Sequence, residues 1–173
     1  MIQFRDKHAS SRQLYETCAE LKEILRNSGC RLLVNDRADV ARAMDADGVH
    51  LGQDDLPVEM ARRVLAPGRL IGCSAHSASQ VVEADRSTAD YIAFGPIFPT
   101  ASKENPDPVV GLEGLQKARR VTRKPLVAIG GITLQNAPEL LAAGADSLAV
   151  IGDLLSGPDI RARAREFLSV LGD

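Results

Sequence analysis

The sequence predicts an α/β protein with a TIM-type (β/α)8 barrel fold. Short apolar runs alternate with amphipathic segments along all 173 residues, a pattern typical of parallel strands covered by helices. Glycine-containing turns follow nearly every apolar run, which suits the catalytic face of a barrel better than a doubly wound sheet with one Gly-rich turn. We count seven strand-helix units, so the first of the eight units of a closed barrel is missing.

Apolar runs predict the strands, in order, at residues 1–5, 31–34, 48–51, 70–71, 90–94, 126–129 and 147–151. Apolar residues at helical spacing predict helices between them, at residues 11–25, around 40–44, and at 58–65, 79–86, 112–121, 134–143 and 159–171. Ser10 and Ser11 can cap the first helix, which Gly29 closes, and Pro57 is well placed to begin the third. No linker interrupts this order, so one barrel domain spanning residues 1–173 is expected.

The missing unit is expected to lie before Met1, because this residue already stands inside a predicted strand. Relative to a complete barrel the domain is then truncated at its N-terminus. Two explanations are open. Either one unit has been lost from this end, or an open seven-strand form has its free edge covered by a partner, which allows a homo-oligomer.

Composition and charge argue against several classes of protein. The net charge of −2 and the pI of about 5.9 give no electrostatic footprint for nucleic acid or an anionic membrane. The three cysteines are scattered without metal-ligand spacing, and the sequence contains neither a secretory signal nor an apolar run of 18 residues. We therefore expect a cytoplasmic protein whose partners are small molecules.

The loop after the fifth predicted strand has the parts of a phosphate site. Gly95 allows the backbone to approach a ligand closely, Thr100 and Ser102 offer hydroxyl groups, and Lys103 adds a positive charge. The Gly130-Gly131 pair and Gly152 follow the last two strands, where barrels usually bind phosphate through backbone amides. Arg5 and Lys7 form with Lys103 a second cationic group.

Carboxylates follow two neighbouring strands. Asp36 and one of Asp54 and Asp55, together with the amide oxygen of Asn35, could hold a Mg2+ ion that retains waters and takes up phosphate oxygens. Two anion sites beside a metal imply one phosphorylated substrate and one metal-bound diphosphate. His76 is a candidate at this rim of the barrel. His50 lies inside a strand and is expected to be a hydrogen-bonded, partly buried residue.

Five segments, at residues 3–7, 35–37, 48–55, 95–103 and 129–132, read QFRDK, NDR, GVHLGQDD, GPIFPTASK and IGGI. In order and spacing they resemble those of thiamine phosphate synthase, within the superfamily that also contains the TenI-type thiazole tautomerases. The resemblance implies a (β/α)8 barrel that joins hydroxymethylpyrimidine diphosphate to thiazole phosphate, giving thiamine phosphate and diphosphate with Mg2+ as cofactor.

The resemblance also implies a role for individual residues. The pyrimidine would contact Gln3, and the diphosphate would be bound by Arg5, Lys7, Asn35, Ser74 and Lys103. The Mg2+ ligands would be Asp36 and Asp55, with Asp54 as a spacer. The thiazole phosphate would be surrounded by Thr100, Ser102, Gly131, Ile151 and Gly152. The catalytic residues, which stabilise the leaving diphosphate, would be Arg5, Ser74 and Lys103.

The chain departs from the family pattern in three places. The first strand and helix are absent, Ser102 replaces a usual Thr, and Gly152 replaces a frequent Ser. Two other functions stay open: a TenI-like thiazole tautomerase, in which His76 would move a proton and no diphosphate would bind, and a non-catalytic, phosphate-binding remnant of the barrel. The joint presence of Arg5, Lys7 and Lys103 favours the synthase.

Overall fold

The computed structural model describes residues 1–102 and 107–172. These residues contain seven strands in alternation with helices, as the sequence predicts. They form two compact units, one made of residues 1–74 and 87–90 and the other of residues 75–86 and the chain from 91 onward. No helix in the described ranges has both the length and the apolar character needed to cross a bilayer.

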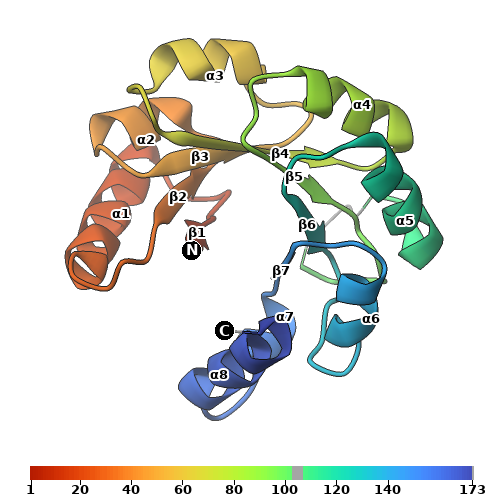
Figure 1. Cartoon of the computed structure of the whole chain (residues 1–173). Coiled ribbons are helices and arrows are strands. Elements are labelled where there is room, and N and C mark those ends of the chain that lie inside the picture. Colours follow the sequence, from red (N-terminus) through yellow and green to blue (C-terminus); the bar gives the residue numbers. More distant parts are fainter. Residues whose placement is uncertain (103–106, 173) are drawn as a thin grey trace. The chain divides into compact units, whose positions relative to one another are not determined.

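The first unit is a parallel sheet covered by helices. Its strands pair in chain order and are β1 (Ile2–Phe4), β2 (Leu32–Asn35), β3 (Gly48–Leu51) and β4 (Leu70–Ala75). The connecting helices are α1 (Ser11–Leu25), α2 (Ala38–Ala43) and α3 (Val58–Val64). Figure 1 shows the three helices on one side of these strands. All the strands therefore end at the same edge of the sheet.

The start of α1 confirms the predicted cap. Ser10 is the N-cap residue, and its hydroxyl accepts the backbone N–H of Gln13 at 3.3 Å. The Gln13 side chain in turn accepts the backbone N–H of Ser10 at 2.8 Å. This reciprocal capping box satisfies two N–H groups that the helix itself cannot bond.

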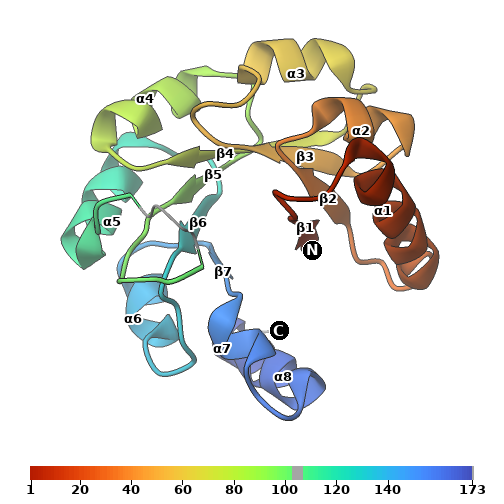
Figure 2. The same ribbon diagram turned by 180° about the vertical axis from the view of Figure 1, so that it is seen from behind.

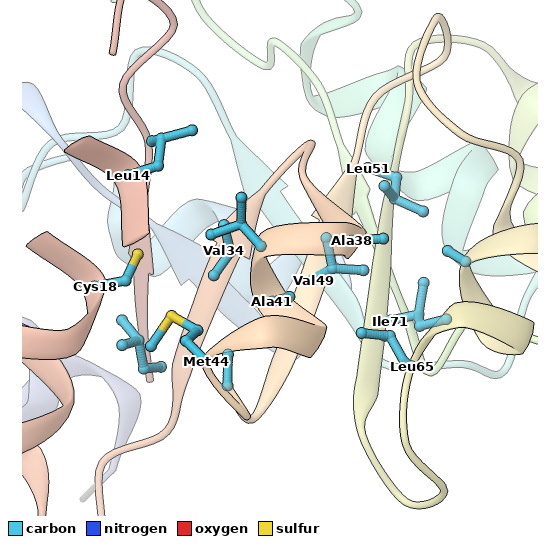
Figure 3. Close-up of a cluster of buried hydrophobic side chains, with 14 residues drawn as sticks. Leu14, Cys18, Val34, Ala38, Ala41, Met44, Val49, Leu51, Leu65 and Ile71 are labelled. Atoms are coloured by element: carbon cyan, nitrogen blue, oxygen red, sulfur yellow. The ribbon is translucent and has the colours of Figure 1, made fainter. Parts of the chain in front are cut away.

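The apolar faces of α1 and α2 meet the sheet in one buried cluster (Figure 3). Leu14 and Cys18 from α1 lie near Val34 of β2, and Val49 of β3 and Ile71 of β4 continue the cluster. Burial raises the pKa of the Cys18 thiol, so this side chain packs as a small apolar group. The cluster holds the strand ends of the first unit in fixed register.

The second unit repeats the arrangement with three parallel strands, β5 (Tyr91–Phe94), β6 (Leu126–Ile129) and β7 (Ser147–Ala149). Its helices are α4 (Ala78–Arg86), α5 (Gly111–Val121), α6 (Ala137–Ala142), α7 (Gly152–Leu155) and α8 (Ile160–Leu171). Figure 2 shows α4, α5 and α6 on one side of the strands, with α7 beside α8.

Some element boundaries differ from the prediction. The fourth strand continues to Ala75, because residues 72–75, which read as a turn, are buried, and Gly72 and Cys73 extend the ladder with β3. The helix expected from residue 134 begins at Ala137, since the Thr133 N–H donates to the Asn136 side chain at 2.8 Å in a preceding turn. The last strand ends at Ala149, and the short α7 was not predicted.

Candidate functional site

The predicted polar residues of the first unit gather at the carboxyl ends of its strands. Gln3 lies within β1 and is exposed. The others follow or end consecutive strands: Arg5 and Lys7 after β1, Asn35 and Asp36 at β2, Asp54 and Asp55 after β3, and Ser74 within β4. Parallel pairing brings these positions to one edge of the sheet, as the sequence predicts.

Asp36 is held in an unusual backbone conformation beside other charged groups. Its φ is 63°, and its N–H donates to the carbonyl of His50 at 2.8 Å. The pKa of its carboxyl is raised to about 6, first by burial and then by a hydrogen bond to Asp55 and the negative charge of that residue. Lys7, whose Nζ lies 3.6 Å from Oδ2 of Asp36, opposes this shift. Asp36 and Asp55 therefore meet as a carboxylate pair.

The loop after β3 orients the second carboxylate. Oδ2 of Asp55 accepts the N–H of Gly52 at 2.7 Å, and Asp55 is half-buried whereas Asp54 is exposed. The described residues contain no cluster of three or more His, Cys, Asp or Glu side chains suited to a metal. Two close carboxylates that repel each other nevertheless fit a Mg2+ ion, which retains waters and accepts substrate oxygens.

Ser74 is fixed by two contacts that sequence reasoning missed. Its Oγ lies 3.0 Å from Nε2 of His50, and its carbonyl accepts a hydrogen bond from the side chain of Gln53. The expectation of a hydrogen-bonded, partly buried histidine is confirmed for the hydrogen bond, and His50 is more deeply buried than expected, at 6% exposed. The sequence signal for this site was a polar side chain, His50, within an apolar strand; its register with Asn35 of β2 and Gly72 of β4 comes from the structure.

In the second unit the loop after β5 carries the predicted hydroxyl groups. Oγ1 of Thr100 accepts the backbone N–H of Ser102 at 3.2 Å, and Ser102 is exposed. Lys103 lies outside the described residues, so its role stays a prediction. Gly95 has a packing role: a Cβ there would lie 2.1 Å from the carbonyl oxygen of Ile129. This close approach of β5 and β6 requires glycine independently of any ligand.

The loop after β6 packs directly on the loop after β5. The N–H of Ile97 donates to Ile129 at 2.9 Å, and the N–H of Phe98 donates to Gly130 at 3.2 Å. Gly131 has a φ of 66°, and a Cβ on it would lie 2.6 Å from the carbonyl oxygen of Pro99. Only glycine fits such a position without displacing backbone.

The loop after β7 is linked to the loop after β6. The N–H of Leu134 donates to Asp153 of α7 at 2.8 Å, which ties the loop after β6 to the start of α7. Asp153 was not singled out from the sequence. Ile151 is 52% exposed, and a Cβ at Gly152 would meet nothing within 4 Å, so no packing contact demands glycine there. The second unit thus brings together the strand-end loops that carry Thr100, Ser102, Gly131, Ile151 and Gly152.

His76 directly follows β4 and contacts one backbone carbonyl and one carboxylate. Its Nδ1 lies within hydrogen-bond distance of the carbonyl of Gly95, and its Nε2 lies 3.3 Å from Oδ2 of Asp107. The His76 side chain is 12% exposed. Its position at the strand ends agrees with the sequence, whereas its contact with Asp107 was not foreseen.

Comparison with known proteins identifies the family. The family described as thiamine monophosphate synthase matches residues 1–154. The chain belongs to this family. A thiamine-phosphate synthase of Koribacter versatilis is 52% identical over 171 residues, covering 99% of this chain and 80% of that protein. Another, of Chloroflexus aurantiacus, is 46% identical over 171 residues, covering 99% of this chain and 79% of that protein.

Comparison with solved structures supports the assignment to the thiamine monophosphate synthase family. The thiamine phosphate pyrophosphorylase of Pyrococcus furiosus is 40% identical and superimposes with a TM-score of 0.90, covering 99% of this chain and 82% of that one. The predicted fold class, a TIM-like fold with seven strand-helix units, is confirmed. A 3-hexulose-6-phosphate synthase, at 18% identity and a TM-score of 0.73, shares the fold alone.

Proposed function

We propose that this chain is a thiamine phosphate synthase, which couples hydroxymethylpyrimidine diphosphate to thiazole phosphate and releases diphosphate. The observation that carries the proposal is the Asp36–Asp55 carboxylate pair beside Lys7. Two acidic groups whose mutual repulsion contributes to the raised pKa of Asp36 favour a divalent cation, and an adjacent lysine favours an anionic substrate. The relatives named thiamine-phosphate synthase align with 99% of this chain.

The first unit would bind the pyrimidine diphosphate. Gln3 would contact the pyrimidine ring, and the diphosphate would meet Arg5, Lys7, Asn35 and the hydroxyl of Ser74. Asp36 and Asp55 would hold Mg2+, which supplies positive charge that stabilises a departing diphosphate. The positively charged side chains of Arg5 and Lys7 would also stabilise the departing diphosphate.

The second unit would bind the thiazole phosphate. Thr100 and Ser102 offer hydroxyl groups, while Gly131 and Gly152 offer backbone amides and Ile151 an apolar contact. The interlocked loops that carry these residues favour a preformed site, since ordered backbone loses little entropy when the phosphate binds. Lys103 would contact the leaving diphosphate.

The reaction needs no protein nucleophile. The bond between the pyrimidine methylene carbon and the diphosphate oxygen breaks first, and the electron pair leaves with the diphosphate. The ring-stabilised cation is then captured by the thiazole nitrogen. The protein would bind and orient both substrates and neutralise the developing charge, which requires cations and hydrogen-bond donors aimed at the leaving group.

Isothermal titration of the chain with the pyrimidine diphosphate tests the proposal. We expect heat of binding that requires Mg2+. Asp36→Ala and Asp55→Ala should each abolish this metal-dependent binding, whereas the matched control Asp54→Ala should retain it. Equal loss in all three variants would reject the metal assignment. A wild-type chain that does not bind the diphosphate would instead point to a tautomerase or an inactive remnant.

A further inference from the structure

The turn between β6 and α6 is closed by the side chain of Asn136. Its Nδ2 donates to the carbonyl of Gly131 at 3.1 Å, and its Oδ1 accepts the N–H of Thr133 at 2.8 Å. The backbone N–H of Asn136 in turn donates to Oγ1 of Thr133 at 3.3 Å. Three hydrogen bonds therefore meet at one partly buried residue.

The partners of this side chain require an amide at position 136. A carbonyl oxygen only accepts hydrogen bonds and a backbone N–H only donates them, so the group between them must offer one donor and one acceptor. Asparagine has both, whereas aspartate, of the same size, has acceptors alone. Aspartate could serve Thr133 equally well, so the donor toward Gly131 is the contact that only asparagine supplies.

Gly131 is a backbone position that needs such support. Its φ of 66° and the clash of a Cβ there with Pro99 require glycine, yet glycine has the largest backbone freedom of any residue. The peptide before Gly131 is held by the N–H of Phe98, which donates to the carbonyl of Gly130 at 3.2 Å. The peptide after it carries the carbonyl that Asn136 binds. Since each peptide is planar, the two bonds together fix the conformation of Gly131.

The same two peptides carry the N–H groups of Gly131 and Ile132. No residue in the described ranges accepts a hydrogen bond from either group. In a trans peptide the N–H points away from the carbonyl, so a bond that holds the carbonyl also directs the N–H on the opposite side. Directed N–H groups that lack a partner in the protein suit an anion such as phosphate.

We propose that Asn136 is a positioning residue that sets the backbone of Gly131 for the phosphate of the thiazole substrate. It acts through the carbonyl of Gly131 and not by contact with the ligand. The inference rests on the proposed function, which assigns the backbone amide of Gly131 to this phosphate.

Three variants separate this role from a general contribution to folding. Asn136→Asp keeps an acceptor for Thr133 and loses the donor to Gly131, and Asn136→Ala loses both. Thr133→Val is the matched control, because it removes the hydroxyl that accepts the Asn136 N–H and leaves the Asn136 amide in place. Only one of the two Asn136 variants adds a negative charge, so an effect that they share cannot come from repulsion of the phosphate.

In steady-state kinetics we expect Asn136→Asp and Asn136→Ala to raise KM for the thiazole phosphate about fivefold, the effect of losing one hydrogen bond. kcat and KM for the pyrimidine diphosphate should stay within about twofold, as for a pure binding effect. Thr133→Val should lower Tm by roughly 3 °C, much as Asn136→Asp does, but keep the wild-type KM. An equal rise of KM in Thr133→Val, or an unchanged KM in either Asn136 variant, would overturn the proposal.

A measurement on the ligand-free chain is independent of synthase activity. 15N relaxation reports the motion of a single backbone N–H on the picosecond-to-nanosecond timescale. We expect the N–H of Gly131 to be rigid in the wild type and in Thr133→Val, and mobile in both Asn136 variants. A wild-type chain without synthase activity would contradict the proposed function but leave this test intact. Equal rigidity of Gly131 in all four proteins would contradict the role of Asn136 itself.

Discussion

Asp36 illustrates at the residue scale how neighbours set the charge of a site. Burial and the proximity of Asp55 disfavour its ionised form and raise its pKa to about 6, against the pull of Lys7. Without a metal, the folded chain therefore binds a proton at Asp36 that the unfolded chain releases at lower pH. A carboxyl with a raised pKa is most favourable to folding when protonated.

From this shift we predict an inverse pH effect on the stability of the metal-free chain. As pH rises from about 4 to 6, the contribution of Asp36 to the free energy of unfolding should fall by about 2 kcal/mol, since each pKa unit corresponds to about 1.4 kcal/mol. Asp36→Asn cannot titrate, and asparagine tolerates the left-handed backbone found here. The difference between variant and wild type in urea denaturation with chelator present isolates the effect.

Above about pH 6, Asp36→Asn should have a higher free energy of unfolding than the wild type, and this difference should vanish near pH 4. Adding Mg2+ at neutral pH should stabilise the wild type and leave Asp36→Asn unchanged, because the cation would offset the repulsion between the two carboxylates. Parallel stability curves for the two proteins across this pH range would show that Asp36 has no raised pKa.

At the scale of elements, the loops after β5 and β6 pack backbone against backbone, and the loop after β7 is attached to them through Asp153. The loops after β5 and β6 are joined by main-chain hydrogen bonds and by the close approach of Gly131 to Phe98 and Pro99, and the loop after β6 is tied to α7 by the bond from the Leu134 N–H to the Asp153 side chain. Such packing leaves no room for a Cβ, and a backbone neighbour cannot move aside as a flexible side chain can. The geometry of these loops therefore depends on glycine, which has no side chain, at position 131.

We predict that Gly131→Ala destabilises the chain by more than the strain of its backbone alone. The matched control is Gly68→Ala, because Gly68 also has a positive φ, of 78°, but a Cβ there meets nothing within 4 Å. Strain should lower the free energy of unfolding by about 1–2 kcal/mol in both variants. The clash in Gly131→Ala should add about 1–3 kcal/mol.

Urea denaturation of both alanine variants beside the wild type measures the difference. If Gly131→Ala and Gly68→Ala lose the same stability, the loop after β6 relaxes around the new methyl group. The tight packing between the loops after β5 and β6 would then not constrain the phosphate-binding backbone.

At the scale of the whole molecule, β1 pairs with β2 and exposes apolar side chains. Met1 is 65% exposed and Ile2 42% exposed. The chain spans about four-fifths of the curated relatives to which it is similar, with 79% and 80% for two of them. We propose that a further strand-helix unit or a second copy of the chain covers β1.

We therefore predict that a strand-helix unit of about 35 residues fused before Met1 raises thermal stability. Burying one large apolar side chain is worth about 2 kcal/mol, which corresponds to a rise in Tm of roughly 5 °C for a protein of this size. A Gly/Ser-rich extension of equal length is the control, since it cannot pair with β1. Differential scanning calorimetry and sedimentation velocity of both fusions and the unextended chain provide the comparison.

A concentration-dependent Tm and a dimer for the unextended chain would favour coverage by a second copy. If the chain is a monomer whose Tm neither extension changes, the exposed side chains of β1 need no cover. That result would contradict both forms of the proposal.

The sequence alone predicted the features that depend on short stretches of chain. Apolar runs located the strands, Ser10 located the start of α1, and the order of motifs pointed to the family. Strand-end residues such as Asp36 and Asp55 could be assigned to one edge because parallel strands end together. Boundaries failed where a local turn signal was overridden, as at Gly72, which packs in a buried ladder.

Only the tertiary structure decided which distant groups touch and what those contacts do to them. The meeting of Asp36 with Asp55, of His50 with Ser74 and of His76 with Asp107 depends on strand register and loop packing, for which the separate segments carry no signal. Burial and charge at close range then alter the pKa of Asp36. Gly95 is a similar case. In the sequence it is typical of a ligand-binding loop, whereas in the structure it is needed because a side chain there would clash with the backbone of β6.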